Sequence, residues 1–130
     1  MIIAGFAVAL AAQAFKPAVP DWPALGPPVN MFESNQFDEV RDSRNAWLGC
    51  VERNARRMSA QRGEPAREVA RAAMRLCLAT YEDYRVKFEL SYLSQGLDND
   101  RVESRERAEM EECTVANVIG WRAAPVPKRR

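Results

Sequence analysis

The chain has 130 residues, of which 47% are apolar, and its 19 basic and 18 acidic side chains give a formal net charge of +1. This length fits one domain with a single small core, and the near-zero charge removes the global argument for a nucleic-acid or anionic-membrane partner. The absence of histidine excludes Ser-His-Asp and Cys-His nucleophiles, a histidine general base and every histidine-containing zinc site.

The composition also argues against enzymatic chemistry. Catalysis would have to rest on carboxylates, a lone cysteine, tyrosine or lysine, and none of these stands in a recognisable catalytic spacing. We therefore expect a protein that is not an enzyme, with no catalytic residue, no cofactor and no identifiable small-molecule substrate. Alanine is a large share of the apolar residues and favours helical packing faces, so the predicted fold class is all-α.

Residues 1–14 resemble a signal peptide. The apolar run from Ile2 to Ala12 is followed by Ala12-Gln13-Ala14, a small-x-small triplet of the kind that signal peptidase cuts, and cleavage would leave Phe15 as the first residue. The run is shorter than the roughly 18–20 apolar residues of a membrane span, so no stable span is predicted. A signal peptide normally begins with basic residues, but none stands directly after Met1. We therefore expect the true start of the chain to lie upstream. The alternative is a buried N-terminal helix of a cytoplasmic protein.

Residues 15–33 form a proline-rich linker. Prolines cannot continue a helix and favour an extended chain. A linker directly behind a cleavage site is typical of an exported domain, so we expect a periplasmic or secreted protein. The prolines that define the linker are Pro17, Pro20, Pro23, Pro27 and Pro28.

Residues 34–122 are predicted to form the helical domain. From about residue 34 to residue 62, apolar residues such as Val40, Trp47 and Val51 recur at spacings of three and four, which indicates an amphipathic helix. Gly63 stands where a helix C′ residue would, and Pro65 stands in the first turn of a second helix. The short connection predicts an antiparallel helical hairpin.

The second helix is predicted over residues 65–95 and carries more apolar surface than one partner helix can cover. Its main stripe consists of Val69, Ala73, Leu76, Cys77, Tyr84 and Phe88. Further apolar residues lie on other faces, namely Leu78, Tyr81, Val86, Leu90 and Leu93.

A third, C-terminal helix is predicted to follow. Asp100 and Glu103 have the spacing of a capping box, and the helix should end near Ile119–Gly120, with its C-terminal half docked on the hairpin. Residues 123–130 are predicted to be a disordered basic tail.

Two cysteines are matched in height across the predicted hairpin. Cys50 lies 13 residues before Gly63 and Cys77 lies 14 residues after it, which places each about 20 Å from the turn. This arrangement predicts a disulfide between Cys50 and Cys77, worth about 3–4 kcal/mol in the chain-entropy picture. The alternative is a pair of buried free thiols.

Cys113 is left over, either as a free thiol or in an intermolecular bridge. A nucleophilic role is disfavoured because Glu111 and Glu112 would raise the pKa of its thiol. The three cysteines also lack the paired C-x-x-C spacing of zinc modules, so no metal site is predicted.

Arg67, Arg71 and Arg75 form a ridge at positions i, i+4 and i+8 of the second helix. They could bind an anionic surface or polyanion, or they could be a solvated face partly paired with acidic residues. Aromatic residues that could stack on bases are not interleaved with this arginine ridge, so no nucleic acid is expected.

The leading hypothesis is an exported helical protein of the cell envelope with a structural or protein-interaction role. It would act through the excess apolar surface of the second helix or by self-association. The alternative is a binding module that uses the basic hairpin tip to contact an anionic surface.

Overall fold

The computed structural model describes residues 15–21, 34–92 and 99–124, and within them it contains four α-helices and no strand. The helices are α1 (Ser34–Ser59), α2 (Ala66–Leu76), α3 (Leu78–Tyr92) and α4 (Asn99–Ala123). The predicted all-α class is confirmed for this part of the chain. The predicted signal peptide, the linker beyond residue 21 and the tail from residue 125 lie outside the described residues.

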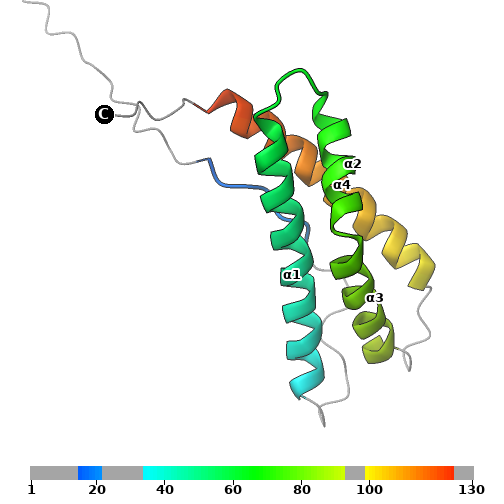
Figure 1. Cartoon of the computed structure of the whole chain (residues 1–130). Coiled ribbons are helices and arrows are strands. Elements are labelled where there is room, and N and C mark those ends of the chain that lie inside the picture. Colours follow the sequence, from blue (N-terminus) through cyan, green and yellow to red (C-terminus); the bar gives the residue numbers. More distant parts are fainter. Residues whose placement is uncertain (1–14, 22–33, 93–98, 125–130) are drawn as a thin grey trace, which may run out of the picture.

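The chain leaves α1, turns, and returns along α2 and α3, both of which pack against α1 (Figure 1). The turn begins earlier than predicted, because α1 ends at Ser59 and the amide of Gln61 donates to the carbonyl of Met58. Gly63 therefore lies inside the loop and does not act as a helix C′ residue; its backbone is not left-handed. Pro65 directly precedes α2, and its carbonyl accepts the amide of Val69 at 3.1 Å.

The predicted second helix is divided at Cys77. This residue has φ −103° and ψ 19°, outside helical geometry, yet its amide still donates to the carbonyls of Ala73 and Met74 at 3.2 Å. The chain therefore continues in nearly the same direction, and the break gives two helices where the sequence predicted one.

The core lies between α1, the α2–α3 pair and α4. Its centre is aromatic: Trp47 stacks on Tyr84 with ring centroids 5.8 Å apart and meets Tyr81 at 4.9 Å. One prediction for the second helix is wrong, since Leu76 of the predicted main stripe is exposed. Tyr81, which the sequence placed on another face, is buried in this core. The buried apolar residues are Val40, Trp47, Val51, Ala55, Val69, Ala70, Ala73, Cys77, Tyr81, Tyr84, Phe88, Met110 and Val118.

Helix α4 crosses the other helices obliquely and packs mainly against α2 and α1 (Figure 1). It continues to Ala123, past the predicted end at Gly120, and Asp100 lies within its first turn instead of preceding it. Gly120 has a packing role, because a Cβ at this position would overlap the ring of Phe15.

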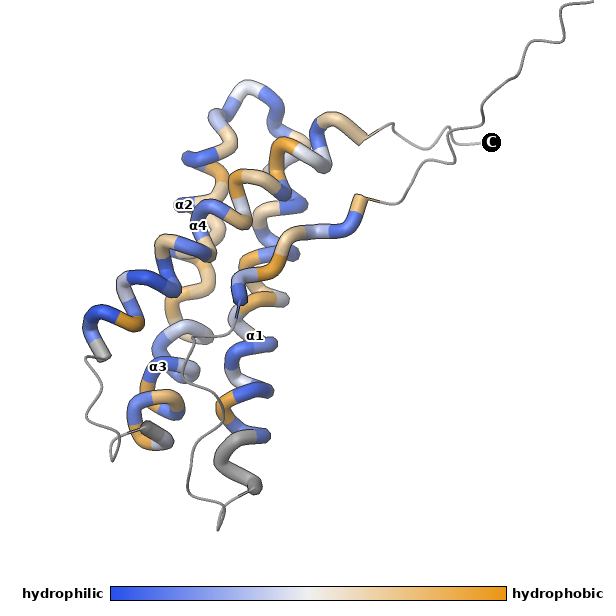
Figure 2. The backbone as a smooth tube through the Cα atoms, turned by 180° about the vertical axis from the view of Figure 1, so that it is seen from behind, coloured by the Kyte–Doolittle hydropathy of each residue, from blue (hydrophilic) through white to orange (hydrophobic). Residues whose placement is uncertain are grey.

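Residues 15–21, the first part of the predicted linker, lie in extended form beside α1 and α4 (Figure 2). The side-chain amide of Asn117 holds the backbone of Ala18 on both sides, accepting its N–H at 2.7 Å and donating to its carbonyl at 2.9 Å. Arg44 donates to the carbonyls of Pro20 and Asp21 at 2.8 and 3.0 Å. This segment is therefore an integral part of the packed domain, which the sequence did not predict.

Candidate functional site

The structure contains the predicted disulfide between Cys50 and Cys77, with the two Cα atoms 5.9 Å apart. It joins the middle of α1 to the break between α2 and α3. The side-chain amide of Asn54 donates to the carbonyl of Cys50 at 2.9 Å and lies 3.4 Å from the sulfur of Cys77. The bridge is thus held within the helix pair and has a structural role.

Cys113 is a free, partly buried thiol on α4. Burial raises its pKa, and the negative charges of Glu109, Asp21 and Glu112 raise it further. A raised pKa lowers the thiolate fraction at neutral pH, so this thiol is not activated as a nucleophile. Of these acids, the sequence indicated only Glu112. Glu109 and Asp21 also raise the pKa of the Cys113 thiol, and the sequence did not indicate them.

Two members of the arginine ridge are paired with acidic residues of α4. Arg67 lies 2.7 Å from the carboxylate of Glu112 and 3.3 Å from that of Glu111. Arg71 also pairs with Glu111 and lies 3.8 Å from Glu68. The hydrogen bond between Arg67 and Glu112 lowers the pKa of that carboxyl. Helix α4 thus neutralises part of the basic ridge, which agrees with the alternative of a solvated and partly paired face.

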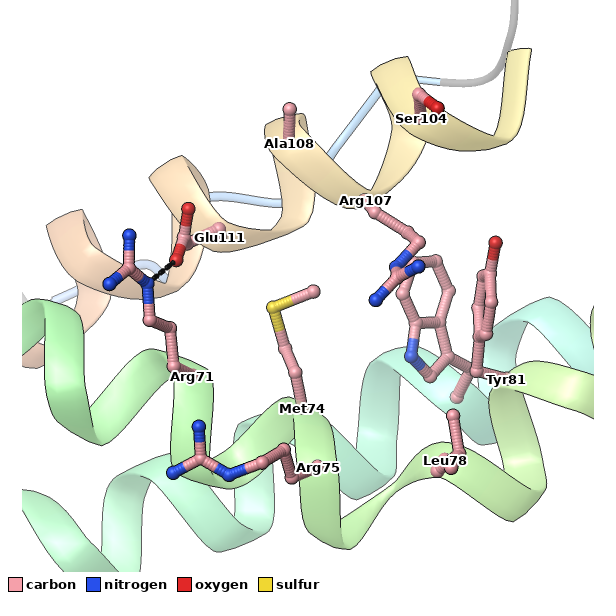
Figure 3. A pocket seen from close by; sticks show the side chains of 10 residues that line it. Arg71, Met74, Arg75, Leu78, Tyr81, Ser104, Arg107, Ala108 and Glu111 are labelled. Carbon is pink, nitrogen blue, oxygen red and sulfur yellow. Dashed lines mark hydrogen bonds and ion pairs between the residues drawn. The ribbon is translucent and has the colours of Figure 1, made fainter. Parts of the chain in front are cut away.

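Arg75 and Arg71 both line a cleft of about 790 Å³ between the α2–α3 pair and α4. The floor of the cleft is apolar and consists of Trp47, Met74, Leu78 and Tyr81. Its charged residues are Arg71, Arg75, Arg107 and Glu111, contributed by α2 and α4. Figure 3 shows Arg71 and Glu111 toward one end, Arg107 and Tyr81 toward the other, and Met74 between them.

Tyr81 combines an apolar face with an unsatisfied polar group. The guanidinium of Arg107 lies 5.4 Å from the centroid of its ring, an arrangement that attracts the cation to the ring face. The Tyr81 hydroxyl is buried and has no hydrogen-bond partner among the described residues. Burial raises its pKa to about 12, with a further contribution from the charge of Glu103, so the hydroxyl stays protonated at neutral pH.

A second buried polar cluster consists of Arg44, Tyr84 and Glu106. Arg44 donates to Glu106 at 3.1 Å, and the Tyr84 hydroxyl donates to both oxygens of the same carboxylate at 2.8 and 2.9 Å. Burial raises the pKa of Glu106, while the hydrogen bonds from Tyr84 and Arg44 lower it. These contacts join α1, α3 and α4 to residues 20 and 21, so the group stabilises the frame around the cleft.

The sequence predicted neither of these polar features, although one signal was present. Arg44 stands between Val40 and Trp47, four residues after the first and three before the second, and so occupies a position on the apolar stripe of α1. A charged residue at such a position indicates a buried ion pair. Arg107 gave no comparable signal, because its place in the cleft depends on how α4 crosses α2.

No group of three or more cysteine, aspartate and glutamate side chains among the described residues is arranged to hold a metal ion. None of the described helices combines the length and apolar character needed to cross a bilayer.

Comparisons with known proteins find no family model, no curated protein and no solved structure that matches this chain.

Proposed function

We propose that this is an exported, non-enzymatic protein of the cell envelope that acts by binding another helix, in the first place a second copy of itself. In this proposal, α1 and the α2–α3 pair work as one disulfide-linked hairpin, and α4 is the third element of the frame. The surface that binds the partner is the outer face of the α2–α3 pair.

The observation that carries the proposal is a stripe of residues on that outer face. Leu76, Ala79, Asp83, Val86 and Leu90, which we call the outer stripe, follow one another at spacings of three, four, three and four. All five are exposed, with exposed fractions of 61% for Leu76, 46% for Val86 and 63% for Leu90. Within α3, the residues Ala79, Asp83, Val86 and Leu90 have the spacing of the a and d positions of a coiled coil, and Leu76 lies just before the break at Cys77.

The outer stripe has no role in the packing of the described residues. The opposite face of α3 supplies Tyr81, Tyr84 and Phe88 to the core, and no residue of the outer stripe lines the cleft. An exposed apolar stripe of this kind marks a protein-interaction site.

The length of the outer stripe, about two heptads, predicts weak association. Stable interfaces bury roughly 1,200–2,000 Å² in total, and two short helices in contact reach the lower end of that range. Asp83 lies within the stripe and pairs with Lys87 at 3.0 Å. A polar residue in a coiled-coil seam selects the register of the pair at a cost in stability, so we expect a specific dimer of micromolar affinity.

The export part of the proposal is supported by the disulfide and the predicted signal peptide together. Disulfides form and persist in oxidising compartments and are rare in the cytosol. The non-enzymatic part is supported by the absence of histidine and by the raised pKa of Cys113.

Association is tested by size-exclusion chromatography with light scattering on the oxidised protein over a range of concentrations. We expect the mass to rise from monomer to dimer, and the change Val86→Gln with Leu90→Gln to abolish the rise. Ile119→Gln is the matched control, because Ile119 is an exposed apolar residue of α4 outside the stripe. A monomeric wild type at every concentration would contradict the proposal.

Export is tested separately, by mass spectrometry of the protein purified from its native source. The expected result is a processed chain that begins at Phe15, with one alkylatable thiol from Cys113. An intact Met1 with three alkylatable thiols would contradict export and leave the association result unaffected.

The alternative, a flat anionic-surface module built on the arginine ridge, has less support. Arg67 and Arg71 are already paired with acids of α4. Changing Arg67, Arg71 and Arg75 together to Gln should therefore leave binding to anionic vesicles unaltered.

A further inference from the structure

We propose that the cleft between the α2–α3 pair and α4 binds an amphipathic carboxylate, a molecule with an unbranched apolar chain and one carboxylate headgroup. This inference does not rest on the proposed function, since no residue of the outer stripe lines the cleft.

The size and floor of the cleft suit an apolar chain. Its volume of about 790 Å³ falls within the range of roughly 300–1,000 Å³ that is typical of small-molecule sites. Met74 and Leu78 expose side-chain surface in the cleft, above the deeply buried Trp47. Leu78 is 53% exposed, and covering such a side chain with an apolar ligand is favourable.

The charges around the floor suit an anionic headgroup. Three guanidinium groups and one carboxylate line the cleft, which leaves it with a net charge of +2. Glu111 is engaged by Arg71 and Arg67, whereas Arg75 and Arg107 form no ion pair among the described residues. Each can offer two parallel N–H donors to a carboxylate, the geometry that guanidinium groups bind best.

The position of Arg107 connects the headgroup to the chain. Its guanidinium lies over the ring of Tyr81, at the edge of the apolar floor that Figure 3 shows around Met74. A carboxylate bound to Arg107 would therefore have its chain directed along Met74 and Leu78. A polyanion is a poor fit, because a largely apolar floor offers nothing to its further charges.

The test uses the full-length oxidised protein and octanoate as the probe, at concentrations below those at which it forms micelles. Titration is followed by the amide NMR signals, and 1-octanol and inorganic phosphate are the comparison ligands. We expect saturable shifts at Met74, Leu78 and Arg107, with octanol bound about tenfold more weakly and phosphate more weakly still.

The combined change Arg75→Gln and Arg107→Gln should reduce the affinity for octanoate to that for octanol and leave octanol binding unchanged. Arg62→Gln is the matched control, because it removes the same charge from the exposed loop between α1 and α2, outside the cleft. Ala108→Trp, at an exposed position that lines the cleft, should block both ligands. Circular dichroism checks that each variant keeps its helices.

Three results would overturn the proposal: no saturable shift, equal affinity for octanoate and octanol in the wild type, or shifts confined to the outer stripe. The last result would assign the ligand to the surface of the proposed function. A wild-type protein that stays monomeric at every concentration but binds octanoate would leave this inference intact and refute the proposed function alone.

Discussion

The change Arg44→Met should destabilise the protein by about 3–5 kcal/mol, the cost of removing one partner from a buried ion pair. Arg44 and Glu106 are 3% and 5% exposed, and their charged groups are 3.1 Å apart. The variant leaves the carboxylate of Glu106 buried beside the Tyr84 hydroxyl. Because small domains have total stabilities of about 5–15 kcal/mol, the loss is a large share of the whole.

The assay is equilibrium unfolding in urea, followed by circular dichroism. Without the positive charge of Arg44, burial should raise the pKa of Glu106 further in the folded state. The folded state then binds a proton that the unfolded state has lost, so the variant should be more stable at about pH 5 than at about pH 8.

A double variant separates the ion pair from other effects of the substitution. Replacing Arg44 and Glu106 together with Met should cost much less than the sum of the two single changes, because no charge is left unpaired. Arg41→Met is the matched control, since Arg41 is an exposed arginine of α1 that pairs with Asp38 at 3.2 Å, and it should change stability by no more than about 1 kcal/mol. The reasoning would be refuted if the losses of unfolding free energy in the two single variants added up to that of the double variant. It would also be refuted if Arg44→Met lost no more unfolding free energy than Arg41→Met.

Three further predictions follow from other contacts. Replacing Cys50 and Cys77 with Ala should lower the free energy of unfolding by about 3–4 kcal/mol in urea melts, because the bridge closes a loop across a sequence separation of 27; an unchanged midpoint would contradict this. Burial and the neighbouring Glu89 raise the pKa of Glu103 from 4.5 to about 7. The folded state therefore holds a proton that the unfolded state has lost, and stability should fall as the pH rises between these two values. In thermal melts, the stability of Glu103→Gln should depend less on pH than that of the wild type. Gly120→Ala should displace the Phe15 ring and speed proteolysis before α1, whereas equal cleavage rates in variant and wild type would exclude that contact.

The features predicted correctly are those that depend on short-range periodicity. The stripe around Trp47 placed α1, and counting residues from the turn brought Cys50 level with Cys77, because both rest on the constant rise of a helix. The break at Cys77 was missed because no glycine or proline marks it. Gly120 was misinterpreted as a helix stop because its lack of a side chain serves a contact with Phe15, more than a hundred residues away.

The candidate site was only partly predictable for a related reason. Arg71 and Arg75 were identified from their spacing, but their interpretation changed once α4 was in place. The crossing angle of α4 brings Glu111 beside Arg67 and Arg71 and places Arg107 in the same cleft as Arg71 and Arg75. Such an angle arises from the packing of whole helices and leaves no local signature in the sequence.

The contact between Ala18 and Asn117 joins positions 99 residues apart, and it has a consequence for biosynthesis. Synthesis proceeds from the N-terminus. The backbone of Ala18 therefore cannot form its hydrogen bonds with Asn117 until α4 has been translated. Closing so long a loop is also entropically unfavourable and slow. The docking of residues 15–21 on the helices must therefore follow the synthesis of α4.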